Sequence, residues 1–195
     1  MQFWKRLWRR IALVVSLAAL LQGAIHVIDA TAQEPRREMV SWVVLFDSDV
    51  EFTVDSLRAE LDRLWPGQFL PQRDNGSFVV EGTVPGAQFM IQSRVPGASG
   101  TFLLHNVPAP YSEFSDLVER IPDASLRDIA KAQGCWISVD LIGKSGAAEA
   151  YKFIGSVLAR IAPPDAAVLL HPSRGTAVRF TADVRRKLAE KGRLE

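Results

Sequence analysis

The pattern of apolar and polar residues along the first half of the chain predicts a buried strand, then a helix, then three further strands. Met39–Phe46 is apolar except for Ser41, which is typical of a strand buried on both faces at the centre of a sheet. Apolar residues then recur three and four positions apart between Thr53, a plausible N-cap, and Trp65, and this spacing predicts an amphipathic helix that Pro66-Gly67 ends. Turn signals roughly every 11 residues separate the strands Phe78–Val84, Ala87–Arg94 and Thr101–Asn106.

The second half of the chain alternates helical segments with two more strands. In chain order we predict helices at Tyr111–Arg120 and Ala124–Gln133, a strand at Trp136–Ile142, a helix at Gly146–Ala162, a strand at Ala166–Leu170 and a helix at Ala182–Gly192. Pro122 divides the first two helices, Ser145 can cap the long helix, and His171–Gly175 is a loop. The order β-α-βββ-αα-β-α-β-α predicts an α+β fold with one mixed or antiparallel sheet of about five to six strands and helices mainly on one face.

The N-terminal segment Met1–Ala32 has the pattern of a secretory signal peptide. Met1–Arg10 carries four cations and no acid, Ile11–Leu21 is apolar, and Ala30-Thr31-Ala32 matches an Ala-x-Ala cleavage site. We therefore expect export, cleavage after this site, and a periplasmic or secreted protein. The alternative is an N-terminal transmembrane anchor through residues 11–28 that is retained, with the domain outside the cytoplasm.

Beyond this leader, the sequence predicts a polar spacer over residues 33–38 and one α+β domain over residues 39–195. The whole chain has a formal net charge of +1, but four cations against one acid place +3 in the leader, so that residues 33–195 carry −2. A slightly acidic chain without a basic block lacks the electrostatic footprint of a nucleic-acid-binding protein. We expect an envelope protein or ligand as the partner, and membrane contact only through residues 11–28 if the leader is not cleaved.

Cys135 is the only cysteine of the chain, so an internal disulfide is impossible and the stability of an exported fold must come from packing. The commonest role of such a cysteine is that of a small buried apolar residue. The alternative is a nucleophile, since Gln133-Gly134-Cys135-Trp136 is similar to the Cys-Trp of papain-like proteases. His171 would then act as the base, and Asp140 would orient it. Against this, Cys135 enters a predicted strand rather than lying at a helix N-terminus, where thiolates are stabilised.

Three polar residues at strand ends are candidate binding residues. His105 ends the third strand of the meander, and His171 and Arg174 lie in the loop after a buried strand, where ligands are often bound. Arg174 could hold a carboxylate or a phosphate, although a solvated arginine in a plain turn is the simpler interpretation. His105, His171 and Asp140 would form a minimal metal set, but the sequence lacks the closely spaced ligand pairs of zinc sites. We therefore predict no metal and no cofactor.

Charged and aromatic residues outside these candidates have simpler interpretations. The cations of the last helix are expected to favour its C-terminal dipole and solubility; they are Arg185, Arg186, Lys187, Lys191 and Arg193. Aromatic residues are spread over strands and helices, as is typical of core residues; they include Trp42, Trp65, Phe78, Phe89, Phe102, Tyr111, Phe114 and Trp136.

Several apolar and turn-forming segments also carry a resemblance to a known family. They are the strand Val40–Phe46, the helix through Leu57–Leu64, the meander ending in Asn106-Val107-Pro108-Ala109-Pro110, the strand Cys135–Leu141, and the segments Ala150–Ile154 and Ala166–His171. From about Val40 to Leu188, the chain resembles the DUF4261-like group of uncharacterised bacterial α+β domains. The resemblance implies no assigned reaction. This chain departs from the group in its leader and in Gly134-Cys135, where members often have a histidine.

These observations lead to two functional hypotheses. The first is a non-enzymatic, exported α+β domain that binds a protein or ligand of the cell envelope, because no catalytic set, metal set or basic face stands out. The alternative is a thiol-dependent hydrolase of the envelope that uses Cys135 with His171.

Overall fold

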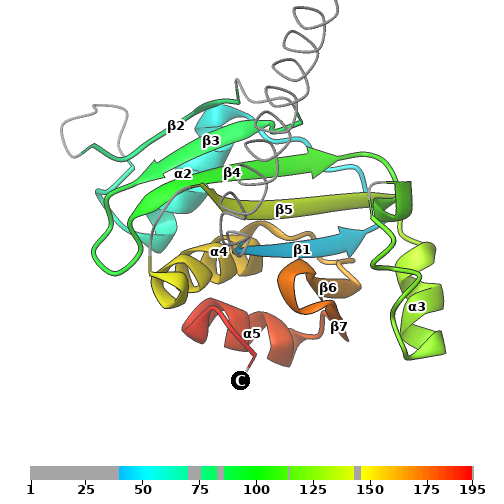
Figure 1. Ribbon diagram of the computed structural model, residues 1–195. Helices are drawn as coiled ribbons and strands as arrows, with labels where there is room; N and C mark the ends of the chain where they lie inside the picture. Colours follow the sequence, from blue (N-terminus) through cyan, green and yellow to red (C-terminus); the bar gives the residue numbers. More distant parts are fainter. Residues whose placement is uncertain (1–39, 70–75, 83–85, 114, 143–145, 195) are drawn as a thin grey trace, which may run out of the picture. The chain divides into compact units, whose positions relative to one another are not determined.

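Seven strands form one open antiparallel sheet in the part of the chain that the structure describes (Figure 1). The computed structural model describes residues 40–69, 76–82, 86–113, 115–142 and 146–194. The strands are β1 Ser41–Phe46, β2 Phe78–Glu81, β3 Phe89–Ser93, β4 Gly100–Val107, β5 Cys135–Ile142, β6 Val168–His171 and β7 Thr176–Arg179. Their order is β2-β3-β4-β5-β1-β6-β7, and every neighbouring pair is antiparallel. The predicted α+β fold around one sheet is confirmed, with more strands than expected.

β1 lies inside the sheet, between β5 and β6, and all six of its residues are buried. Val44 pairs with Ile137 of β5 on one side and with Leu169 of β6 on the other. A strand with neighbours on both edges and cover on both faces needs apolar residues at every position, rather than alternate ones. The nearly continuous apolar run therefore predicted its place correctly.

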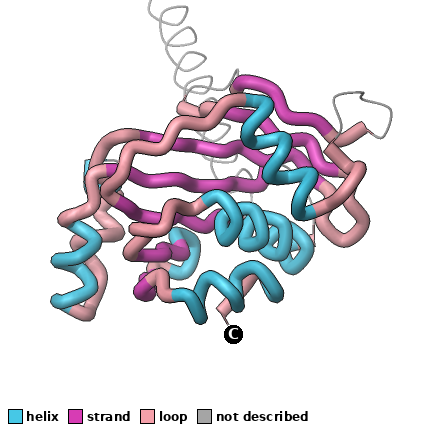
Figure 2. The backbone as a smooth tube through the Cα atoms, turned by 180° about the vertical axis from the view of Figure 1, so that it is seen from behind, coloured by secondary structure: helices cyan, strands magenta, loops and turns pink. Residues whose placement is uncertain are grey.

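Most of the helical cover lies on one face of the sheet, the face that Figure 2 presents. The described helices are α2 Val54–Leu64, α3 Ala124–Lys131, α4 Ala147–Ile161 and α5 Ala182–Lys191. Leu61, Phe153 and Leu188, one each from α2, α4 and α5, share an apolar core with Val44 of β1. α3 packs on the other face, in a second core that includes Leu45. The expectation of helices mainly on one face is confirmed.

Side-chain caps begin α2 and α5 at the threonines that the sequence indicates. Thr53 and Ser56 form a capping box at the start of α2, each side chain accepting a hydrogen bond from the other's backbone N–H. Thr181 caps α5 through its own side chain. At α4, Gly146 is the N-cap and makes no side-chain bond, while Ser145, the expected cap, lies outside the described residues.

The predicted helix Tyr111–Arg120 is not formed. Only its start is helical, as the 3-10 turn η2 Tyr111–Glu113, and the described residues after it lie in turns. The Ser115 hydroxyl accepts a hydrogen bond from the Leu117 N–H at 3.2 Å, a local bond that competes with helical pairing. Leu117 is nonetheless buried in the second core. A turn, rather than the predicted helix, therefore brings Leu117 into this core.

The sequence pattern assigned no element to Thr176–Arg179, which forms the edge strand β7 and pairs with β6. Its four residues are exposed at both ends and only partly buried in the middle. An edge strand has one neighbouring strand and little contact with the core, so its apolar pattern is weak.

The predicted strand Phe78–Val84 is shorter than expected, because β2 ends at Glu81. Residues 83–85 lie outside the described ranges.

Candidate functional site

The neighbouring strands β4 and β5 bring His105 and Asp140 together on one face of the sheet. Phe102 and Leu104 of β4 point into the core under α2 and α4, so His105, which alternates with them, faces the other side. The His105 Nε2 lies 3.1 Å from the Asp140 Oδ2. Ser138, directly opposite His105 in the ladder, donates through Oγ to the same Oδ2 at 3.0 Å. A polar group of three side chains thus stands on the face away from α2, α4 and α5.

Both ring nitrogens of His105 face hydrogen-bond acceptors. Nδ1 lies 2.7 Å from the carbonyl oxygen of Gly86, and Nε2 faces the Asp140 carboxylate. A neutral imidazole carries a single N–H, so only the protonated ring donates to both acceptors. The hydrogen bond to Asp140 raises the pKa of His105 against the opposing effect of burial, and the Asp140 charge and the Gly86 carbonyl add to the increase. Gly86 adopts a φ of 85°, a conformation that favours glycine.

This polar group forms one side of a small pocket. The pocket has a volume of about 160 Å³ and is lined by Ser41, Val43, His105, Tyr111, Trp136, Ser138, Asp140 and Pro172. The rings of Tyr111 and Trp136 meet edge to face, with their centroids 5.3 Å apart and their planes at 82°. Burial raises the pKa of the Tyr111 hydroxyl, so this ring is a neutral wall. An aromatic wall beside a few convergent polar groups is typical of ligand-binding sites.

Ser41 contributes the unpartnered polar atom of this pocket. The residue is 1% exposed, and its Oγ has no hydrogen-bond partner among the described residues. It lies in β1 directly opposite Asp140 of β5, and therefore on the same face of the sheet. Burying a hydroxyl without a hydrogen bond costs roughly 1–3 kcal/mol, so a ligand that bonds to this oxygen would remove an existing cost. Sequence reasoning missed this residue, although it is the polar exception in an otherwise apolar strand.

The order of the polar groups differs from that of a catalytic triad. In a triad, the histidine lies between the nucleophile and the carboxylate and takes the proton of the nucleophile. Here Asp140 lies in the middle and contacts both Ser138 and His105 through Oδ2. Ser138 is also only 3% exposed. The geometry therefore favours binding at this pocket over nucleophilic attack by Ser138.

The structure separates Cys135 from His171, the pair considered for a thiol-dependent hydrolase. Cys135 lies opposite Phe46 at one end of β1, whereas the His171 ring packs against Trp42 near the other end, with centroids 4.3 Å apart. Four residues of a strand span about 13 Å, so this imidazole does not reach the thiol. Burial raises the pKa of Cys135, and the charges of three neighbouring aspartates raise it further. A thiolate nucleophile requires the opposite shift.

His171 and Arg174 belong to a tight turn at the end of β6. The 3-10 turn η3 Pro172–Arg174 follows His171 directly, and the His171 Nδ1 accepts a hydrogen bond from the Arg174 N–H at 3.3 Å. The His171 side chain is buried against Trp42 and Tyr151. The histidine thus caps a turn, while the Arg174 residue is exposed.

The three residues considered as a metal set are divided between the two faces of the sheet. His105 and Asp140 are in contact on one face, whereas His171 packs on the face that α4 covers. In the described ranges, no group of three or more His, Cys, Asp or Glu side chains is arranged to hold a metal ion. The sequence led us to expect that Asp140 would orient His171, but Asp140 pairs with His105 instead.

No protein family, curated protein or solved structure matches this chain significantly. The resemblance to the DUF4261-like group therefore stays a prediction.

Among the helices described, none is long and apolar enough to cross a membrane. The expected leader Met1–Ala32, the alternative anchor at residues 11–28 and the spacer at residues 33–38 all lie outside the described residues.

Proposed function

We propose that the protein is an exported, non-enzymatic binding protein of the cell envelope, and that its pocket around His105 takes a neutral, hydroxyl-bearing group such as one sugar unit of a glycan. The observation that carries the proposal is the Ser41 hydroxyl, which is buried at the pocket and has no hydrogen-bond partner in the part of the chain that the structure describes. A ligand hydroxyl can either donate to this oxygen or accept from it. Such a ligand therefore supplies the missing hydrogen bond whichever way the serine proton points.

The charges of the pocket favour a neutral ligand group. The Asp140 carboxylate is paired with His105, whose cationic form this contact favours, and the other lining residues are uncharged. The contacts with Ser138 and His105 use only Oδ2 of Asp140. The second carboxylate oxygen, Oδ1, can therefore accept a hydrogen bond from a ligand hydroxyl.

The size of the pocket favours one group of a larger ligand. Sites that enclose whole small molecules have volumes of roughly 300–1,000 Å³, whereas this pocket has about 160 Å³. The Tyr111 ring offers an apolar wall for the carbon face of a sugar, and the polar side chains offer partners for its hydroxyls.

Export is the second part of the proposal, and it is supported by the basic, apolar and Ala-x-Ala segments of the leader.

Binding is tested by NMR titration of the purified protein with neutral mono- and oligosaccharides of bacterial envelopes. The protein is expressed from the whole sequence and used in the form in which the cells produce it. The ligand should shift the Trp136 indole resonance and the Ser41 and Asp140 amide resonances. Ser41→Ala should weaken binding about tenfold, the effect of one hydrogen bond. The same variant should keep or raise the free energy of unfolding, because it removes a buried hydroxyl that has no hydrogen-bond partner among the described residues.

Ser156→Ala is the matched control for this experiment. Ser156 is also buried, but its Oγ donates to the Ala189 carbonyl at 3.0 Å, between α4 and α5. This control should lose roughly 1 kcal/mol of stability and keep its affinity for the saccharide. The proposed ligand class is wrong if no saccharide shifts the pocket resonances, or if Ser41→Ala binds as well as the control does.

A further inference from the structure

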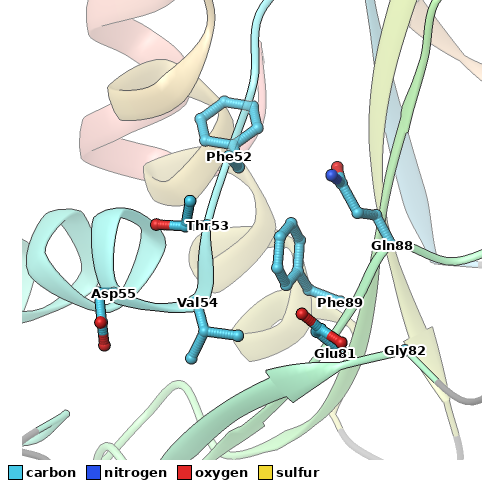
Figure 3. Close-up of a pocket in the computed structure, with 8 residues that line it drawn as sticks. All are labelled: Phe52, Thr53, Val54, Asp55, Glu81, Gly82, Gln88 and Phe89. Atoms are coloured by element: carbon cyan, nitrogen blue, oxygen red, sulfur yellow. The ribbon is translucent and has the colours of Figure 1, made fainter.

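A second cleft lies between the start of α2 and the strands β2 and β3 (Figure 3). Its volume is about 540 Å³, and its lining residues are Phe52, Thr53, Val54, Asp55, Glu81, Gly82, Gln88 and Phe89. This volume lies within the range of roughly 300–1,000 Å³ that is typical of ligand sites. Phe52 and Phe89 pack in the core under α2 and α4. The cleft therefore lies on the opposite side of the sheet from the His105 pocket and is independent of it.

The walls of this cleft combine apolar surface with negative charge. Figure 3 shows the Val54 side chain, the Phe89 ring and the Glu81 carboxylate facing a common space. Two carboxylates and no Lys, Arg or His line the cleft. Asp55 pairs with Arg58 at 2.6 Å, whereas Glu81 forms no ion pair with any described residue. The chain that leads into the cleft, Asp47–Phe52, adds three acids and no base.

An acceptor atom at the same cleft lacks a donor. The Gln88 Oε1 is buried and has no hydrogen-bond partner among the described residues. The backbone of Gln88 is held on both sides, because its N–H donates to the Leu104 carbonyl at 2.9 Å and its carbonyl accepts from Gly82 at 2.8 Å. These bonds hold the Gln88 backbone beside Gly82, and Figure 3 shows its side-chain amide pointing toward Phe52, with the Phe89 ring between it and the Glu81 carboxylate.

We propose that this cleft binds the cationic side chain of an arginine or lysine in a peptide segment of a partner protein. The charged head would meet the Glu81 carboxylate, which accepts N–H donors and forms no ion pair with any described residue. The methylene stem would lie along Phe52 and Phe89, since long cationic side chains cover apolar surface with their stems and interact favourably with aromatic faces. A free inorganic cation would leave these apolar walls unused, so a side chain with a stem fits the lining better.

Short capped peptides with one central residue between glycines test this proposal on the purified protein from the full-length gene. The central residue is arginine, lysine or citrulline, the last being the neutral isostere of arginine. The arginine or lysine peptide should shift the amide resonances of Gly82, Gln88 and Phe89, and the citrulline peptide should bind at least about tenfold more weakly. The interaction should also weaken at high salt, because it depends on charge at an open cleft.

Glu81→Gln should weaken binding of the cationic peptide about tenfold, and Glu149→Gln is its control. Glu149 is an exposed acid on α4, away from the residues that line the cleft. Unfolding curves of both variants verify that the fold is intact. The proposal is overturned if the cationic peptides cause no shift, if citrulline binds equally well, or if the two variants bind alike. Ser41→Ala should leave peptide binding unchanged. A negative result at this cleft would therefore not affect the proposal for the His105 pocket, and the reverse also holds.

Discussion

Carboxylates raise the pKa of two titratable residues of this protein, with opposite consequences for the charge of each. Asp140 lies beside His105 and raises the pKa of the imidazole by favouring its cation. Near Cys135, burial and the negative charges of neighbouring aspartates raise the pKa of the thiol by disfavouring its anion. The first effect favours the charged form of His105, and the second favours the neutral form of Cys135. At the scale of single residues, local electrostatics support a polar binding group at His105 and a structural role for Cys135.

The stability that His105 provides should depend on pH. An imidazole has a pKa of about 6.5 in the unfolded chain, and contact with Asp140 raises the pKa in the folded state. The stabilisation is therefore complete below about pH 6.5 and is lost as the pH rises through the higher folded-state pKa. We expect the wild-type protein to lose roughly 1 kcal/mol more than His105→Gln between mildly acidic and alkaline pH. Urea unfolding of both proteins at the two pH values measures this; an identical pH dependence would contradict the protonated pair.

At the scale of elements, α4 and α5 approach each other through two glycines. A Cβ atom on Gly155 would lie 2.6 Å from the Gly192 Cα, and one on Gly192 would lie 2.2 Å from the Tyr151 carbonyl oxygen. Gly192 ends α5 with a φ of 69°, and its carbonyl accepts a buried hydrogen bond of 3.0 Å from the Trp42 indole. The glycines thus permit a helix contact that also holds the central strand.

Arg185 fixes the same pair of helices at their other end. Its guanidinium donates to the carbonyls of Ala159, Ala162 and Pro163 at 3.2, 2.9 and 2.7 Å. The carbonyls at the C-terminal end of a helix lack helical partners, and Arg185 bonds to this end of α4 and to the residue that follows its cap. The sequence suggested a solvated cation in the last helix. Instead, this arginine caps the preceding helix, and burial lowers its pKa.

Gly155→Ala should destabilise the protein even though alanine favours helix formation. The added methyl group would press on the backbone of α5, and such overpacking costs roughly 1–3 kcal/mol, against a gain of about 1 kcal/mol from helix propensity. Gly146→Ser is the control, because a Cβ atom there meets only the Glu149 side chain, at 3.9 Å. The serine can also cap α4, so the free energy of unfolding should change by only about 0.3 kcal/mol. Chemical denaturation compares the two; an unchanged or higher stability of Gly155→Ala would refute the close contact.

At the scale of the whole domain, β1 joins the two apolar cores. Val44 faces the core with α2, α4 and α5, whereas Val43 and Leu45 face the core with α3. β1 also pairs with β5 and β6, which come much later in the chain. One strand therefore connects both layers, and Met39–Glu195 is a single compact unit. The only cysteine is a buried free thiol, so packing and hydrogen bonds hold this unit together.

The proposed export is a prediction at the same scale, because it concerns where the whole domain would act. Expression of the full-length gene in a bacterium should yield a protein in the envelope fraction or medium whose mass corresponds to cleavage after Ala32, so that it begins at Gln33. Cell fractionation and intact-mass measurement test this. A full-length protein in the membrane fraction would instead identify residues 11–28 as a retained anchor. Accumulation of the uncleaved chain in the cytoplasm would contradict export.

The parts of the fold that depend on local patterns were predictable from the sequence. The continuous apolar run of β1, the apolar stripe and N-cap Thr53 of α2, and the meander of β2, β3 and β4 each rest on residues that are neighbours in the chain. The pattern failed where local and tertiary preferences differ. In the segment after Tyr111, Ser115 bonds to the backbone and interrupts a helix, and β7 owes its existence to pairing with β6.

The candidate site was only partly predictable, for the same reason. The sequence by itself determined the α+β class, the buried central strand and the chemical identity of His105 and Asp140 as candidates. Alternation along a strand decides which residues share a face of that strand, but it does not decide which strand lies beside it or in which register. Only the tertiary structure placed His105 against Asp140, put Ser41 opposite that carboxylate and left Cys135 and His171 apart. These relations depend on contacts between residues far apart in the chain, which no local pattern encodes.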